Sequence, residues 1–196
     1  MESSATGLRS RPLRSDARDN RDRVLRAART VFAESGPKAS LNEIAKRAGV
    51  GPGTLYRHFP SLQALLVTII GRDVATLCAA GDELLTHPSP DDALKLWLKA
   101  VAVHATAMNG LVATEMAAQL GHDDTALAAC HNQIIHTGTA LLARAQESGS
   151  TSAHIAIRDL LVLVNALAWA SQQSPDDKSL LDRLLAIAFA AGPKAL

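Results

Sequence analysis

Hydrophobic residues recur at helical spacing near the start of the chain. Between residues 20 and 35 they fall at i, i+3, i+4, i+7 and i+8, the repeat that places apolar side chains on one face of an α-helix. The members of this stripe are Val24, Ala27, Ala28, Val31 and Phe32. The pattern predicts a helix that begins near Asp19 or Asn20 and ends at Gly36 and Pro37.

Two shorter helices are predicted next. Ser40 and Glu43 form an S-x-x-E capping box at the start of an apolar-faced segment, residues 41–48, and a glycine that suits a helix end follows. After a three-residue turn, Pro52 fits the first position of a helix that continues to Phe59. Two short helices joined by a tight turn and packed on a longer one are a helix-turn-helix unit, whose second short helix enters the major groove of DNA.

The third predicted helix separates apolar from polar side chains. Leu55 and Phe59 lie four residues apart and face inward together. The side chains turned outward are Thr54, Arg57 and His58, with Tyr56 at the margin. This outward face is the part of the helix-turn-helix that is free to touch a partner.

From residue 62 onward the pattern predicts five or six longer helices. We expect them at about 62–85, 91–109, 111–120, 123–147, 155–172 and 176–191. Gly81 is a possible weak point in the first of these helices. The last two are apolar almost all round, so we expect them to pack on the same two helices of a second copy, as a four-helix bundle in a two-fold homodimer. The alternative is a central helix buried in a monomer.

Composition supports an all-α fold. The 196 residues include 36 Ala and 28 Leu but only six aromatic residues, and this excess of helix formers excludes a β-sandwich or barrel. No uninterrupted apolar run reaches the roughly 18 to 20 residues that cross a bilayer, and residues 1–23 lack the apolar centre of a secretion signal. Cys78 and Cys130 have no CxxC partner, which fits reduced thiols. We therefore expect a cytoplasmic protein without a membrane partner.

Charge is distributed unevenly along the chain. Through Ser61 there are 12 Lys and Arg against 6 Asp and Glu, whereas the rest has 8 against 13. Residues 1–18 are polar and Arg-rich and are expected to form a flexible basic arm that reaches into a groove of nucleic acid. A basic segment joined to an acidic one suits a protein of which only the first part approaches a polyanion. The alternative is chance segregation of solvated charge.

The same residues resemble a known family. RVLRAA at 23–28, VFAESG at 31–36, LNEIAKRAGV at 41–50 and GTLYRHFPSLQAL at 53–65 match, in order and spacing over about 45 residues, the DNA-binding domain of TetR-family transcriptional regulators. The helical pattern of the remainder is similar to a TetR ligand-binding and dimerisation domain. The resemblance implies three parts: an arm at 1–18, a helix-turn-helix domain at 19–61 and a ligand-binding and dimerisation domain at 62–196.

The resemblance also implies which residues touch DNA, with 52–59 as the recognition helix. They are Ser40, Asn42, Pro52, Gly53, Thr54, Tyr56, Arg57 and His58. Thr54 can meet a base edge or a phosphate, and Tyr56 and His58 a phosphate. Arg57 takes a guanine edge or a phosphate; both alternatives are open.

Ser40 or Asn42 can bond a phosphate at the start of the second helix, although Ser40 can instead be fully occupied as a helix cap. The sequence departs from the family pattern in two respects. Leu62 stands where many relatives have a Lys, so one expected phosphate contact is missing. The Arg-rich arm is expected to compensate for it. Gly51 and Gly53 leave little side chain at the start of the recognition helix, which favours readout of DNA shape.

By this resemblance the protein is a dimeric repressor that binds a pseudo-palindromic operator and releases it when an unidentified small-molecule effector binds the larger domain. A mixed apolar and polar pocket has seven candidate residues, although Met and Trp at helical spacing are more often simple core. They are Trp97, His104, Met108, Met116, Gln119, Asn165 and Trp169.

Other classes of function have weaker support. Four histidines, His104, His122, His131 and His136, suggest a metal-responsive regulator, but none stands at a recognisable ligand interval, so no metal site is assigned. There is no G-x-S-x-G, P-loop or dinucleotide fingerprint, so we expect neither an enzyme nor a cofactor. A helical interaction module without DNA binding is a further alternative, and it would show no salt effect on duplex binding.

Overall fold

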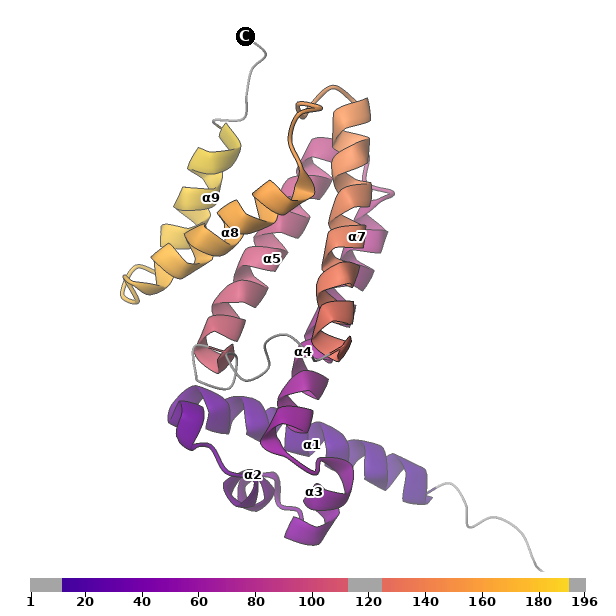
Figure 1. Cartoon of the computed structure of the whole chain (residues 1–196), viewed down its shortest axis with the longest axis vertical. Coiled ribbons are helices and arrows are strands. Elements are labelled where there is room, and N and C mark those ends of the chain that lie inside the picture. Colours follow the sequence, from indigo (N-terminus) through magenta and orange to yellow (C-terminus); the bar gives the residue numbers. More distant parts are fainter. Residues whose placement is uncertain (1–11, 113–124, 191–196) are drawn as a thin grey trace, which may run out of the picture. The chain divides into compact units, whose positions relative to one another are not determined.

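The computed structural model of the protein describes residues 12–112 and 125–190 (Figure 1). Within these two ranges all regular secondary structure is helical, which confirms the all-α fold class. The chain divides into two compact units, Met1–Leu66 and Val67–Leu196.

The first unit contains three helices and the beginning of a fourth. They are α1 at Pro12–Ser35, α2 at Leu41–Ala48, α3 at Pro52–His58 and the first turn of α4, which spans Leu62–Leu84. α1 packs on α2 and α2 on α3. The apolar stripe predicted for α1 is buried, as are Ile44 of α2 and Leu55 of α3. A small hydrophobic core thus holds the helix-turn-helix together.

The start of α1 corrects the sequence-based prediction. The helix begins at Pro12 and not near Asp19. Residues 12–18 carry no apolar stripe, so hydrophobic periodicity gives no signal there, although proline is well tolerated at a first helical position and the following Leu, Arg and Ala are good helix formers. Of the expected flexible arm, residues 12–18 are therefore helical, and residues 1–11 lie outside the described residues.

The second unit is built around α5 (Figure 1). Its helices are the remainder of α4, α5 at Pro90–Val112, α7 at Thr125–Glu147, α8 at Ile157–Gln172 and α9 at Leu180–Ala190. α5 packs on α7, α8 and α9, and its buried face contributes Trp97, Leu98 and Val101 to the core. The extensive contact between α5 and α8 makes this pair the spine of the unit.

Two boundaries in the second unit differ from the prediction. α5 continues through Asn109 and Gly110 to Val112, so a single Asn-Gly pair did not end it. Of the separate helix expected at 111–120, residues 111 and 112 belong to α5, and residues 113–120 lie outside the described residues. α9 begins at Leu180 rather than at 176. The Asp177 carboxylate accepts hydrogen bonds from the backbone N–H and hydroxyl of Ser179, which hold a turn in front of the helix.

Gly81 does not weaken α4 but makes room for Trp97. A Cβ at Gly81 would lie 2.3 Å from Thr137 Cγ2 and 2.8 Å from Trp97 Nε1, and one at Gly138 would lie 2.7 Å from Trp97 Cζ3. Trp97 is fully buried, and its indole N–H donates to the carbonyl of Leu77 at 3.2 Å. The two glycines therefore form the space for the indole, and α4 runs unbroken through Gly81.

α4 has the length and mean hydropathy of a helix that could cross a membrane, and it is the one such helix among the described residues. Arg72 and Asp73 interrupt its apolar sequence, and Leu65, Leu66 and Ile69 are fully buried within the protein. The core helix of a soluble protein has the same features, so this helix is weak evidence for a membrane span.

Candidate nucleic-acid interface

α2 is held by hydrogen bonds at both of its ends. The Ser40 hydroxyl accepts a hydrogen bond from the backbone N–H of Glu43 at 3.2 Å, which is the predicted cap. At the other end Gly49 adopts φ 65°, and the N–H of Val50 donates to the carbonyl of Ala45 at 3.1 Å. The Ser40 oxygen is thus engaged in capping, while its hydroxyl proton is still available to an external acceptor.

α3 buries one face and exposes the other. Leu55 is fully buried, and Phe59, directly after the helix, is 2% exposed. The predicted contact residues divide by exposure: Pro52, Gly53, Tyr56, Arg57 and His58 are exposed, and Thr54 is half-buried. At the start of α2, Ser40 and Asn42 are also exposed. The fold thus leaves all eight predicted residues accessible, on the ends and outer face of two adjacent helices.

Cations around α3 differ in whether they already have a partner. Arg47, in the last turn of α2, lies 2.5 Å from Glu34 and 3.5 Å from Glu43, and the hydrogen bond to Glu34 raises the pKa of the guanidinium. Lys46 and Arg57 form no ion pair within the described ranges. Arg47 therefore ties α2 to α1, whereas Lys46 and Arg57 have no carboxylate partner among the described residues and can pair with an external anion.

The structure adds two cations that sequence reasoning did not assign to the interface. One is Lys46, in the last turn of α2. The other is Arg21 of α1, whose guanidinium carbon lies 5.8 Å from the centre of the Phe59 ring. The His58 ring lies 6.5 Å from the same ring. Arg21 could not be assigned from spacing, because its proximity to α3 depends on how α1 packs.

The glycines at the start of α3 stand in open space. A Cβ at Gly53 would meet nothing within 4 Å, and one at Gly51 would meet only Thr54 Oγ1 at 4.0 Å. Neither glycine is required for packing inside the protein. Because Gly51 and Gly53 have no side chain, the backbone there is accessible, which a close approach to a DNA strand requires.

The predicted pocket residues that the structure describes differ in burial. Trp97 is in the core, His104 is half-buried, and Asn165 and Trp169 are exposed on α8. Met116, Gln119 and the side chain of Met108 lie outside the described residues. Of the four histidines weighed for a metal, His122 also lies outside them, and no group of three His, Cys, Asp or Glu that could hold a metal occurs in the described part of the chain.

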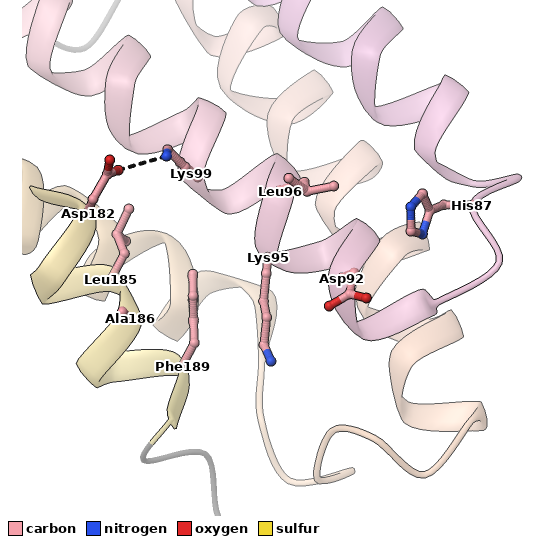
Figure 2. Close-up of a pocket in the computed structure, with 9 residues that line it drawn as sticks. All are labelled: His87, Asp92, Lys95, Leu96, Lys99, Asp182, Leu185, Ala186 and Phe189. Carbon is pink, nitrogen blue, oxygen red and sulfur yellow. Dashed lines mark ion pairs between the residues drawn. The ribbon is translucent and has the colours of Figure 1, made fainter.

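A groove that the sequence did not reveal lies between α5 and α9 (Figure 2). It has a volume of about 540 Å³. Its lining comes from the turn before α5, from one face of α5 and from one face of α9: His87, Asp92, Lys95, Leu96, Lys99, Asp182, Leu185, Ala186 and Phe189. Lys99 Nζ and Asp182 Oδ1 form an ion pair of 2.8 Å at one end.

Both units match known families. Residues 24–69 match the family described as "Bacterial regulatory proteins, tetR family", and residues 89–191, more than half of the chain, match "Transcriptional regulator SbtR-like, C-terminal domain". The HTH-type transcriptional regulator SAUSA300_2515 of Staphylococcus aureus (strain USA300) is 44% identical over 76 residues, 38% of this chain. That match spans only 37% of the relative's length.

Solved structures agree over nearly the whole chain. The TetR transcriptional regulator SCO0520 from Streptomyces coelicolor is 34% identical, with a TM-score of 0.71 over 89% of this chain and 99% of that one. LfrR from Mycobacterium smegmatis, a TetR-like regulator solved in complex with proflavine, shares the fold at 22% identity, with a TM-score of 0.67 over 92% and 99%. The chain, a DNA-binding regulator and not an enzyme, belongs to the TetR family of bacterial transcriptional regulators.

Proposed function

We propose that this regulator is a homodimeric repressor that binds a pseudo-palindromic operator through α3 and releases it when a small molecule binds the second unit. The observation that supports it most is the division of α3 into two faces. Leu55 is fully buried, while Tyr56 and Arg57 are exposed and Arg57 has no ion-pair partner in the described ranges. A helix that is anchored on one side and cationic on the other suits the major groove.

Each exposed side chain is proposed to have a role set by its chemistry. Thr54 meets a base edge, Tyr56 and His58 meet phosphates, and Arg57 is the candidate for bidentate contact with guanine. Ser40 and Asn42 approach a phosphate at the amino end of α2, where the helix dipole favours negative charge. The open backbone at Pro52 and Gly53 allows close approach of the strand.

The dimer is proposed to form through α8 and α9. Val162 and Trp169 of α8 are 69% and 60% exposed, and Ile187 of α9 is 66% exposed. Large apolar side chains at such exposure mark a surface that a second copy covers. The dimer then sets two α3 helices about 34–36 Å apart, one turn of DNA, which is why the operator is proposed to be pseudo-palindromic.

The second unit is the proposed place of the effector. LfrR, which shares this fold, binds proflavine, and release of DNA requires that the effector prefer a conformation that the operator does not. Of the predicted pocket residues, Asn165 and Trp169 lie instead on the proposed dimer face, and Trp97 belongs to the core. A chromosomal operator places the proposed repressor in the cytoplasm.

Duplex binding by matched variants tests the proposal. A duplex is selected from random sequence with the wild-type protein, and the dissociation constants of wild type, Arg57→Ala and Arg26→Ala are measured. Arg26 is an exposed arginine of α1, so it controls for loss of one positive charge. We expect Arg57→Ala to weaken binding by roughly 1–3 kcal/mol and to relax sequence preference if Arg57 reads a guanine, with Arg26→Ala near wild type. Equal effects of both variants would contradict the role given to α3.

A further inference from the structure

Arg21 of α1 lies at the end of α3, and neither family match includes it, since the first of them begins at residue 24. Its guanidinium carbon is 5.8 Å from the centre of the Phe59 ring, and Phe59 directly follows α3. We propose that Arg21 binds a phosphate of the DNA backbone at the edge of the groove that α3 enters. This inference deepens the proposed function and rests on its contact between α3 and DNA.

The Phe59 ring holds Arg21 in place. Phe59 is 2% exposed, so its ring belongs to the core of the first unit and has little freedom to move. Leu25, four residues after Arg21 on the same side of α1, is also buried, so this side of α1 faces the helix-turn-helix. A guanidinium over an aromatic ring is attracted to the ring face. Because the side chain is already ordered, it loses less entropy when it binds a ligand.

The hydrogen-bond donors of Arg21 are available to a ligand. A guanidinium has five N–H donors in one plane, and an aromatic ring offers them no lone pair. Within the described ranges Arg21 forms no ion pair and no hydrogen bond. By contrast, Arg23 donates to the side chain of Asn20, and Arg47 donates to Glu34. An ordered guanidinium with free donors suits a phosphate, which it can bind through two parallel hydrogen bonds.

Exposed groups of α3 lie around the same ring. Arg57 and His58 are exposed in the last turn of α3, and the His58 ring is 6.5 Å from the Phe59 ring that Arg21 contacts. Arg18, one turn before Arg21 on α1, is exposed and has no ion pair in the part of the chain that the structure describes. A phosphate bound at Arg21 would therefore be flanked by cations and donors from two helices.

The carboxylates of the first unit do not oppose this contact. Four occur between residues 18 and 66: Asp19, Asp22, Glu34 and Glu43. Glu34 and Glu43 both pair with Arg47. Asp22 is half-buried and already has an interaction within the protein. Asp19 is exposed, but it is two residues from Arg21 and so lies on a different side of α1. The charge that faces an approaching phosphate is thus positive.

Matched variants separate a phosphate contact from a role in covering Phe59. Arg21→Met keeps an unbranched apolar side chain over the ring and removes the charge and the donors. Arg26→Met is the control, because Arg26 is an exposed arginine of the same helix. By fluorescence anisotropy we expect Arg21→Met to bind a selected duplex roughly threefold to tenfold more weakly than Arg26→Met, with Tm within about 2 °C of wild type. Equal duplex affinity of the two variants overturns the proposal.

The salt dependence of binding identifies the lost contact as a phosphate. In Arg21→Met the slope of log affinity against log salt concentration is expected to fall by about one unit. The change is expected for the selected duplex and for an unrelated one, because a phosphate contact carries no sequence information. Arg21→Lys restores the charge without the planar fork, so it is expected to restore the slope. An unchanged slope in Arg21→Met, or a loss confined to the selected sequence, overturns the proposal.

Ethylation of single phosphates locates the contact on the duplex. An ethylated phosphate has no negative charge, so it weakens binding wherever the protein contacts that phosphate. We expect at least one phosphate at which ethylation weakens binding of the wild type and of Arg26→Met but not of Arg21→Met. An interference pattern that is identical in all three proteins overturns the proposal.

The same measurements distinguish failure of this inference from failure of the proposed function. If Arg57→Ala weakens duplex binding while Arg21→Met matches its control, the inference fails and the proposed function stands. If Arg21→Met lowers the salt slope while Arg57→Ala matches Arg26→Ala, Arg21 contacts phosphate and the role given to α3 fails. If the wild type binds no duplex under any condition, both fail.

Discussion

The exposed faces of α3 and α8 differ in chemistry although both helices bury an apolar face. α3 presents Tyr56, Arg57 and His58 to solvent, whereas α8 presents Val162 and Trp169. The buried faces explain how each helix is held and are similar in kind. The outer faces indicate which partner each helix binds. The face of α3 suits a polyanion, and such a contact weakens as salt concentration rises. The face of α8 suits an apolar partner, and such a contact depends little on salt.

The largest expected effect is on dimer stability, when charged residues replace the exposed apolar residues of α8. In Val162→Glu with Trp169→Glu, each glutamate would be buried without a partner in a dimer, which costs about 2–5 kcal/mol per charge. The dimer dissociation constant is expected to rise by more than about 100-fold, measured by sedimentation equilibrium. Lys178→Glu, a charge change on an exposed turn, is expected to leave it unchanged. A wild-type protein that is monomeric at every concentration would contradict the account.

A second difference between the units is how tightly they are packed around glycine. Gly81→Ala places a methyl group 2.3 Å from Thr137 Cγ2, and overpacking of this kind costs roughly 1–3 kcal/mol. Gly53→Ala on α3 meets open space and is expected to be neutral or to stabilise by up to about 1 kcal/mol. Denaturant unfolding followed by circular dichroism measures both. Equal destabilisation would mean that the space around Trp97 is not filled as described.

A smaller effect is expected when one hydroxyl is removed from the α3 face. Tyr56 is 46% exposed, so Tyr56→Phe leaves folding intact and deletes one donor to phosphate. Duplex affinity is expected to fall by about 0.5–1.5 kcal/mol, equally for specific and unrelated sequences, as measured by fluorescence anisotropy. A loss confined to the selected sequence would instead assign Tyr56 to base readout.

The smallest effect concerns the turn before α9. Hydrogen bonds from Arg183 and then Ser179 lower the pKa of the Asp177 carboxyl well below its usual value. A lowered pKa means that the stabilisation is present above the ordinary aspartate pKa of about 3.9 and is lost as pH falls through the lowered pKa. The difference in Tm between wild type and Asp177→Asn is therefore expected to be small at neutral pH, since the group is exposed, and to vanish in acid. A difference that grows in acid would reverse the assigned sign.

Local patterns predicted the first unit well. The spacing of Val24, Ala28 and Val31 gave the buried face of α1, and Ser40 with Glu43 gave the start of α2, because both signals act between residues close in sequence. The inward position of Leu55 followed from the same periodicity. The start of α1 did not, since residues 12–18 are helical although hydrophobic periodicity in the sequence gives no signal there.

The candidate pocket depends on contacts that spacing along the sequence does not determine. A tryptophan at helical spacing suits a core and a pocket equally, and only the space beside Gly81 and Gly138 places Trp97 in the core. The groove unites Lys95 of α5 with Phe189 of α9, which are distant in sequence and meet through packing alone. No local pattern carries that information.

The salt dependence of duplex binding tests the central claim most directly. The dissociation constant of wild type for a selected duplex is measured from about 50 to 200 mM salt, and the slope is compared between wild type and Arg57→Ala. If α3 docks on DNA, the logarithm of the affinity falls linearly and steeply with the logarithm of salt concentration. Each phosphate contact contributes about one unit to the slope. A flat dependence, with no duplex preferred over any other, would contradict the account.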